Sequence, residues 1–135
     1  MGFYETLEEF GYTQFLQKVV YESPNFVNLE NVLAEIQTIV STNAKVLIFG
    51  DYDVDGLMCI RILKEGLHLL GARNVDVFRY RKRMHSLDAL AVQQCIQGNY
   101  KYCIIADCGS NNISLLHKLL DYGIKVILLD HHEVN

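Results

Sequence analysis

The chain has 135 residues, half of them apolar, and a formal net charge of −4. This length and composition suffice for one globular domain with a hydrophobic core. The acidic balance argues against a protein that coats nucleic acid through its overall charge, although a local basic patch is compatible with it. No apolar run is long enough to span a bilayer, and the N-terminus lacks the pattern of a signal peptide.

The four cysteines are Cys59, Cys95, Cys103 and Cys108. They form no Cys-x-x-Cys pair, so neither a zinc ribbon nor a thioredoxin motif is indicated. Cysteines within helix and strand patterns are typical of reduced core thiols in a cytosolic protein. We therefore expect a cytoplasmic protein with no membrane association.

The spacing of apolar residues over residues 1–43 predicts an N-terminal helical segment. Apolar and aromatic residues recur at roughly helical spacing over residues 3–22, and Pro24 ends this region. Asn28 can cap a second helix, which has one apolar face.

From residue 44 onward, short aliphatic runs alternate with amphipathic segments. The predicted strands are residues 45–49, 74–80, 101–106 and 124–129, and the predicted helices are residues 57–70, 87–97 and 113–122. A glycine that suits the left-handed position follows each helix: Gly71, Gly98 and Gly123. Alternating strands and helices predict βαβ units, and all-aliphatic strands indicate that both sheet faces are covered. We therefore expect an α/β domain over residues 44–135, with a parallel β-sheet of about four strands and helices on both faces.

An acidic stretch follows the first predicted strand. Asp51, Asp53 and Asp55 stand at every second position, flanked by Gly50 and Gly56. In an extended segment such side chains project to one side. Like charges raise one another's pKa, and a divalent cation is the simplest compensation, with the glycines letting the backbone bend around it. A solvated acidic turn is the plainer alternative.

The pattern Asp-x-Asp-x-Asp-Gly also matches the first half of a calcium-binding EF-hand loop. That loop needs a glutamate at its twelfth position, where this chain has Ile62. It also needs a preceding helix, where this chain has a predicted strand. The sequence therefore excludes an EF-hand.

Two further acids, Asp107 and Asp130, directly follow predicted strands. The carboxyl ends of parallel strands meet at one edge of a sheet, so we expect these acids beside the first cluster. His131 and His132 follow Asp130 and add imidazole nitrogen. Mixed carboxylate and imidazole donors favour Mn²⁺, with Mg²⁺, Co²⁺ or Fe²⁺ tolerated, over calcium. Four or more carboxylates can hold two ions, an arrangement suited to phosphoester displacement. The isolated histidines, interpreted as packed or surface residues, are His68, His85 and His117.

Two other segments at this edge suit phosphate groups. The loop from Asp107 to Ser110 offers backbone amides and a serine hydroxyl at a predicted helix start. A basic run leaves the second strand and consists of Arg79, Tyr80, Arg81, Lys82 and Arg83. Its cations suit phosphates and its tyrosine suits stacking on a base. A solvated surface loop is the plainer alternative for such a charge run.

Three motifs carry a resemblance, and they are Gly50-Asp51-Tyr52-Asp53-Val54-Asp55-Gly56, Asp107-Cys108-Gly109-Ser110 and Asp130-His131-His132. Together they resemble the first three motifs of the DHH phosphoesterase family, and the first is most similar to the RecJ branch of single-strand-specific 5′→3′ DNA exonucleases. The match covers roughly residues 44–133. The resemblance implies metal-dependent hydrolysis of single-stranded DNA, with roles in DNA repair and recombination.

The resemblance also implies roles for individual residues. The implied ligands of Mn²⁺ or Mg²⁺ are Asp53, Asp55, Asp107 and His131, with Asp51 adjoining them at the metal site. The complete enzyme would hold two ions. His132 would bind or polarise the scissile phosphate.

Members of this family continue past the third motif with a fourth acidic motif and a C-terminal substrate-binding domain, whereas this sequence stops three residues after His132. We expect an incomplete catalytic domain with little activity alone, the fourth motif coming from a missing C-terminal part or a partner chain. One alternative is a non-catalytic module that binds nucleic acid or a replication partner. Another is a phosphodiesterase of oligonucleotides or cyclic dinucleotides, which is disfavoured because Phe49 stands where those relatives usually carry a histidine.

Overall fold

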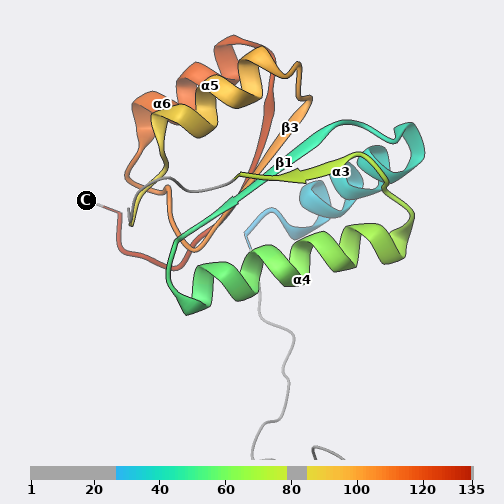
Figure 1. The fold of residues 1–135 in the computed structure, drawn as a ribbon, viewed down its shortest axis with the longest axis horizontal. Helices are drawn as coiled ribbons and strands as arrows, with labels where there is room; N and C mark the ends of the chain where they lie inside the picture. Colours follow the sequence, from blue (N-terminus) through green and yellow to red (C-terminus); the bar gives the residue numbers. More distant parts are fainter. Residues whose placement is uncertain (1–26, 79–84, 135) are drawn as a thin grey trace, which may run out of the picture.

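A parallel β-sheet forms the centre of the computed structural model, which describes residues 27–78 and 85–134 (Figure 1). The strands are β1 (Val46–Gly50), β2 (Val75–Val77), β3 (Tyr102–Ala106) and β4 (Lys125–Leu129). Their order is β2-β1-β3-β4, and each neighbouring pair is parallel. The helices are α3 (Leu29–Thr42), α4 (Val54–Leu70), α5 (Ala89–Gln97) and α6 (Ile113–Asp121).

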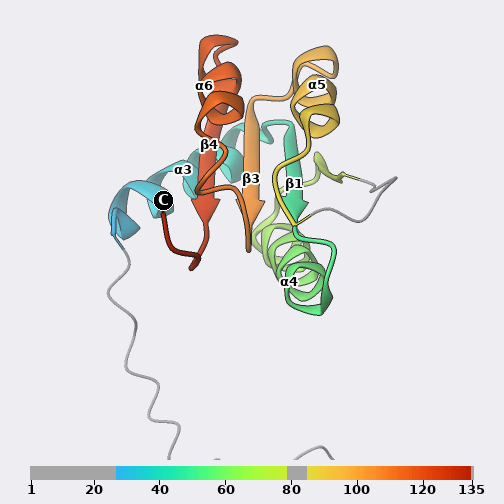
Figure 2. The same cartoon turned by 90° about the vertical axis from the view of Figure 1, so that its left-hand side faces the viewer.

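Helices cover both faces of the sheet (Figure 2). Helices α3 and α4 lie on one face, and α5 and α6 lie on the other. Within β1, Leu47 and Phe49 belong to the core beneath α5 and α6, whereas Val46 and Ile48 belong to the core beneath α3 and α4. Strand side chains alternate between faces, so a strand covered on both sides is apolar throughout. The predicted α/β fold is confirmed.

The register of the sheet brings three acids to one level. Gly50 pairs with Ala106, and Ala106 pairs with Leu129. The next residue along each strand is an acid, and these are Asp51, Asp107 and Asp130. The amides of the first two acids extend the ladder, at 3.3 Å to the carbonyl of Ala106 and at 2.8 Å to that of Leu129. Backbone pairing therefore sets the acids side by side.

The acidic stretch after β1 is not extended, contrary to the expectation from its spacing. Helix α4 begins at Val54 rather than near residue 57, because the Asp53 carboxylate accepts a hydrogen bond from the Gly56 amide at 3.1 Å and caps the helix. Asp55 therefore lies in the first helical turn. The argument that three alternate side chains project to one side of a strand was wrong.

The predicted helix ends are confirmed in part. Gly71 (φ 109°) and Gly123 (φ 72°) adopt the left-handed conformation. Gly98 does not (φ −82°), and Asn99 (φ 52°) adopts it instead, a conformation that asparagine tolerates. At the start of α3, Asn28 occupies the N-cap position as predicted, but its side chain makes no capping hydrogen bond.

Some predictions lie outside the described residues. These are the helix over residues 3–22, the basic run from Arg79 to Arg83 and the end of the strand expected over 74–80. The division of the chain near residue 44 also stays a prediction. Among the helices that the structure describes, none is long and apolar enough to cross a membrane.

Gly50 and Gly56 allow the start of α4 to approach the end of β1. A Cβ atom on Gly56 would lie 2.3 Å from the carbonyl oxygen of Asp51, and one on Gly50 would lie 2.7 Å from the side chain of Ile60. Neither glycine has a positive φ. These positions therefore need glycine for close approach, rather than for the backbone bend expected from the sequence.

We expect Gly56→Ala to lower the free energy of unfolding by about 1–3 kcal/mol, because the added methyl group meets the backbone of Asp51. Gly66→Ala is the matched control, since it lies in the same helix and its Cβ would have nothing within 4 Å. Alanine there should stabilise the protein by about 0.5–1 kcal/mol. Urea denaturation measures both changes, and equal midpoints for the two variants would contradict the argument.

Candidate metal centre

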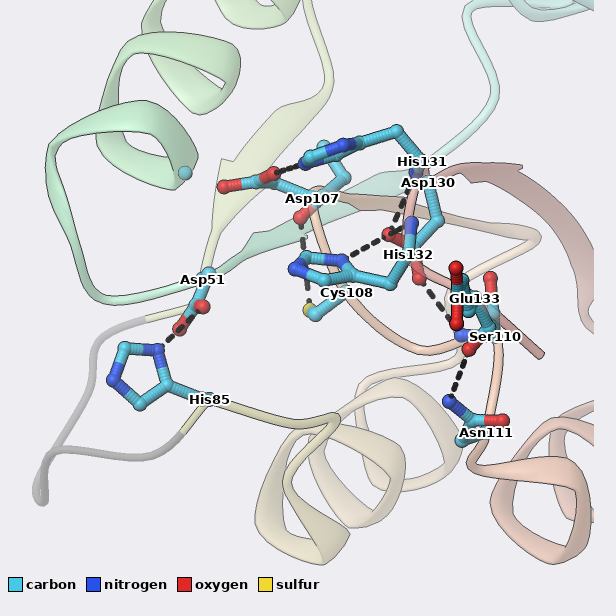
Figure 3. Close-up of polar contacts among 12 residues, drawn as sticks. Asp51, His85, Asp107, Cys108, Ser110, Asn111, Asp130, His131, His132 and Glu133 are labelled. Carbon is cyan, nitrogen blue, oxygen red and sulfur yellow. Dashed lines mark hydrogen bonds and ion pairs between the residues drawn. The ribbon is translucent and has the colours of Figure 1, made fainter. Parts of the chain in front are cut away.

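The carboxyl ends of β1, β3 and β4 carry an acidic rim, formed by Asp51, Asp107 and Asp130 (Figure 3). Two of these residues are nearly buried, since Asp51 is 3% exposed and Asp107 is 8% exposed. A carboxylate removed from water needs hydrogen-bond donors or cations around it. The groups around each acid therefore indicate whether its charge is compensated by hydrogen bonds or is available to a metal ion.

Asp107 lies beside the two histidines that follow β4 (Figure 3). Its Oδ1 atom lies 3.2 Å from Nε2 of His131. Asp107, His131 and His132 each offer one ligand atom within 4.8 Å of the others, a spacing that allows one ion to be shared. We call these three residues the first donor group.

Asp130 holds both histidines in place. Its Oδ1 accepts hydrogen bonds from the amides of His131 at 2.8 Å and His132 at 3.2 Å, and lies 2.6 Å from Nδ1 of His132. Partial burial opposes ionisation, but the hydrogen bonds from Ser110 and His132 outweigh it and hold the pKa of the Asp130 carboxyl below its ordinary value. Asp130 is therefore an ionised residue that orients the histidines.

The loop after β3 is tied to the segment after β4. The Ser110 amide donates to Oδ2 of Asp130 at 3.0 Å, and the side-chain amide of Asn111 donates to the carbonyl of Glu133 at 2.9 Å. The Ser110 amide that the sequence suggested for a phosphate thus already has an acceptor. A phosphate contact by Ser110 stays a prediction.

A second donor group lies on the β1 side of the rim and consists of Asp51, Asp53 and His85. Oδ2 of Asp51 lies 2.8 Å from Nδ1 of His85, while Oδ1 accepts a hydrogen bond from the Tyr52 amide at 2.6 Å (Figure 3). One ligand atom from each of the three residues lies within 4.8 Å of the others. The sequence interpretation of His85 as an ordinary packed or surface residue missed this contact. No spacing links His85 to the acids, because it approaches from the segment before α5.

The pKa of the Cys108 thiol responds to acids of both donor groups. Burial raises its pKa to about 12, and the negative charges of the acids contribute. The contributing acids are Asp51, Asp130, Asp107 and Asp53. Residues from both groups therefore share one negative region.

Asp55 lies in the same region but in neither donor group of the described chain. The pKa of Cys59 is raised by burial first, and then by the charges of Asp107, Asp55 and Asp53. The exposed Asp55 carboxylate in the first turn of α4 thus acts on the same thiol as Asp107, which follows β3.

The donor set fits a divalent transition-metal ion. Each group combines carboxylate oxygen with imidazole nitrogen, a mixture that suits Mn²⁺ better than calcium. The carboxylates are also concentrated where solvent cannot fully screen them, which favours a cation. The residues of the rim therefore include groups that could bind such an ion.

A family model described as the DHH family, N-terminal domain, matches residues 45–135. The chain belongs to the DHH family. Curated relatives include two proteins named single-stranded-DNA-specific exonuclease RecJ. The one from Thermus thermophilus is 31% identical over 106 residues, which is 77% of this chain and 16% of that protein. The one from Bacillus subtilis is 25% identical over 116 residues, which is 84% of this chain and 14% of that protein.

Solved structures show the same relationship. RecJ from Thermus thermophilus in complex with Mn²⁺ aligns with a TM-score of 0.70 at 28% identity, over 83% of this chain and 16% of that chain. An exonuclease RecJ bound to manganese aligns with a TM-score of 0.71 at 28% identity, over 83% of this chain and 29% of that chain. A DHH domain described as belonging to a family of ribosomal proteins shares the fold, with a TM-score of 0.58 at 14% identity over 96% of this chain and 36% of that chain. The matched part of the chain covers only 14–16% of the length of these curated RecJ proteins.

We expect an NMR titration to give a higher pKa for His132 in the native chain than in the Asp130→Asn variant. The hydrogen bond to the Asp130 carboxylate raises this pKa, although desolvation opposes it. A raised pKa means that protonated His132 stabilises the fold below a pH of about 6.5, and that this contribution is lost as the pH rises through the folded-state pKa. The exposed His117 on α6 serves as the internal reference. Superimposable His132 curves in the two proteins would contradict the assignment.

Proposed function

We propose that this chain supplies the metal-binding part of a DHH-family site that hydrolyses phosphodiester bonds in single-stranded DNA. The observation that carries the proposal is the acidic rim, in which three in-register acids lie beside His131 and His132. Two relatives named single-stranded-DNA-specific exonucleases and two manganese-bound RecJ structures support the substrate and the ion. A RecJ-like 5′→3′ direction is part of the same proposal.

The proposed ligands come from both sides of the rim. They are Asp53, Asp55, Asp107 and His131, with Asp51 adjoining them. Bound Mn²⁺ or Mg²⁺, in a pair of ions, would supply charge neutralisation and Lewis-acid activation of water at the scissile phosphate. The protein side chains hold that chemistry at the carboxyl end of a rigid sheet, which suits precise positioning.

His132 is proposed to contact the scissile phosphate. Asp130 engages its Nδ1 atom at 2.6 Å, which leaves Nε2 to donate a hydrogen bond to a phosphate oxygen. The same carboxylate raises the pKa of His132, so a larger fraction of the ring is cationic near neutral pH. A cationic donor binds phosphate more strongly than a neutral one.

A graft tests the hydrolytic function. Residues 45–135 replace the matching segment of Thermus thermophilus RecJ, and the graft is incubated with Mn²⁺ and a 5′-labelled single strand. We expect digestion of the single strand but not of a duplex, and loss of digestion in the Asp107→Asn graft. A graft that is folded by circular dichroism and binds Mn²⁺ and the strand without cutting it would instead favour the non-catalytic binding module.

We expect Mn²⁺ to raise the thermal midpoint of the 135-residue chain, because an ion that binds only the native state stabilises it by mass action. Asp107→Asn should reduce this shift, whereas Asp121→Asn, at an exposed acid at the end of α6, should leave it unchanged. The shift should shrink as the pH falls through the histidine range, since a ligating imidazole must be neutral. Equal midpoints in Mn²⁺ and EDTA would count against the site.

We expect the basic run to carry much of the affinity for single strands. In the sequence the run follows β2 and precedes His85, and the side chain of His85 contacts Asp51 of the rim. The quadruple alanine variant replaces Arg79, Arg81, Lys82 and Arg83. It should flatten the dependence of log K on log salt by about 3 for four lost phosphate contacts, since each contributes about 0.7 on single strands. Tyr80→Ala should weaken binding with little change in that slope, because stacking neutralises no phosphate. An unchanged slope in the quadruple variant would favour the alternative interpretation, in which the run is a solvated surface loop.

A further inference from the structure

We propose that His85 is a metal-binding residue that holds a second ion together with Asp51 and Asp53. This inference rests on the proposed function and deepens it, because it assigns an ion to each side of the rim. His85 lies outside all three sequence motifs of the family resemblance.

The distances suit a shared ion. Two ligand atoms bound to one ion at about 2.1 Å lie about 3.0 Å apart when adjacent and about 4.2 Å apart when opposite. The Asp51 Oδ2 to His85 Nδ1 distance is 2.8 Å, close to the adjacent value. All three residues of the second donor group offer ligand atoms within 4.8 Å of one another. An ion can therefore replace the hydrogen bond between Asp51 and His85 with little movement of either side chain.

Charge and burial favour an ion over the hydrogen bond alone. The Asp51 side chain is 4% exposed, and the carboxylate of Asp53 joins it in the same group. A single imidazolium can neutralise only one of two carboxylates. A divalent cation neutralises both, and neutral His85 completes a mixed oxygen and nitrogen set of the kind that Mn²⁺ accepts.

Hydrogen bonds hold the backbone that follows His85. Two residues after His85, the amide of Leu87 donates to the side chain of Asn112 at 3.0 Å, and Asp88 caps α5 by accepting from the Leu90 amide at 2.8 Å. On the ring itself, Tyr52 packs against His85 with their centroids 4.3 Å apart. The imidazole is thus held from two directions, as a ligand position requires.

A purely structural role is the competing interpretation, in which the pair of His85 and Asp51 only anchors the start of α5. The two interpretations differ in what happens when the hydrogen bond is kept and the ligand is removed. His85→Gln does this, because its amide N–H can still donate to Asp51, whereas the amide nitrogen that takes the place of the imidazole nitrogen is a donor only and has no lone pair to bind Mn²⁺. The matched control is His117→Gln on α6.

The experiment counts bound Mn²⁺ on the full 135-residue chain by the loss of the electron paramagnetic resonance signal of the free ion. We expect two ions on the native chain. His85→Gln should retain one ion and bind the other at least tenfold more weakly, and His131→Gln should retain the ion that depends on His85. His117→Gln should match the native chain, and circular dichroism in EDTA confirms that every variant is folded.

The failures are distinguishable. One ion on the native chain, or two ions with unchanged affinities in folded His85→Gln, overturns the role of His85 and leaves the proposed function standing. No bound Mn²⁺ on the native chain removes the proposed function together with this inference.

Discussion

The hydrogen-bond ladder that joins β1, β3 and β4 fixes the site before any side chain is considered. Parallel strands in this register place Asp51, Asp107 and Asp130 at one level, and the amides of the first two continue the ladder. A shift of one residue in any strand would move its acid out of line and turn its apolar side chains to the wrong face. The hydrophobic core and the acidic rim are therefore set by the same backbone pairing.

The rim concentrates negative charge, and the fold compensates it in different ways at each acid. Asp130 is satisfied by amides and by His132, Asp51 by an amide and His85, and Asp53 by the first turn of α4. Asp107 is nearly buried, and its Oδ1 atom lies 3.2 Å from Nε2 of His131. Hydrogen bonds thus hold three of the carboxylates in position, while the charge of the whole set still favours a divalent cation.

The sequence was sufficient for the order of the elements, the parallel sheet and the convergence of the strand-end acids, because period and position along parallel strands determine them. It was not sufficient for the local geometry. Asp53 caps α4 and removes the expected extended segment, which depends on a competition between strand and helix that spacing cannot decide. The contact between His85 and Asp51 was also missed, since a tertiary approach from a loop leaves no periodic signal.

The left-handed backbone of Asp107 (φ 61°) limits what this position can become. Most side chains are strained in that conformation, whereas glycine, asparagine and aspartate tolerate it. Glutamate would keep the negative charge but lose this tolerance, and glycine would keep the backbone but lose the charge. Position 107 therefore has two independent requirements, a left-handed backbone and a negative charge, and only aspartate meets both. A library of variants selected only for folding should accept glycine, asparagine and aspartate at position 107. A further selection for ion binding should retain only aspartate.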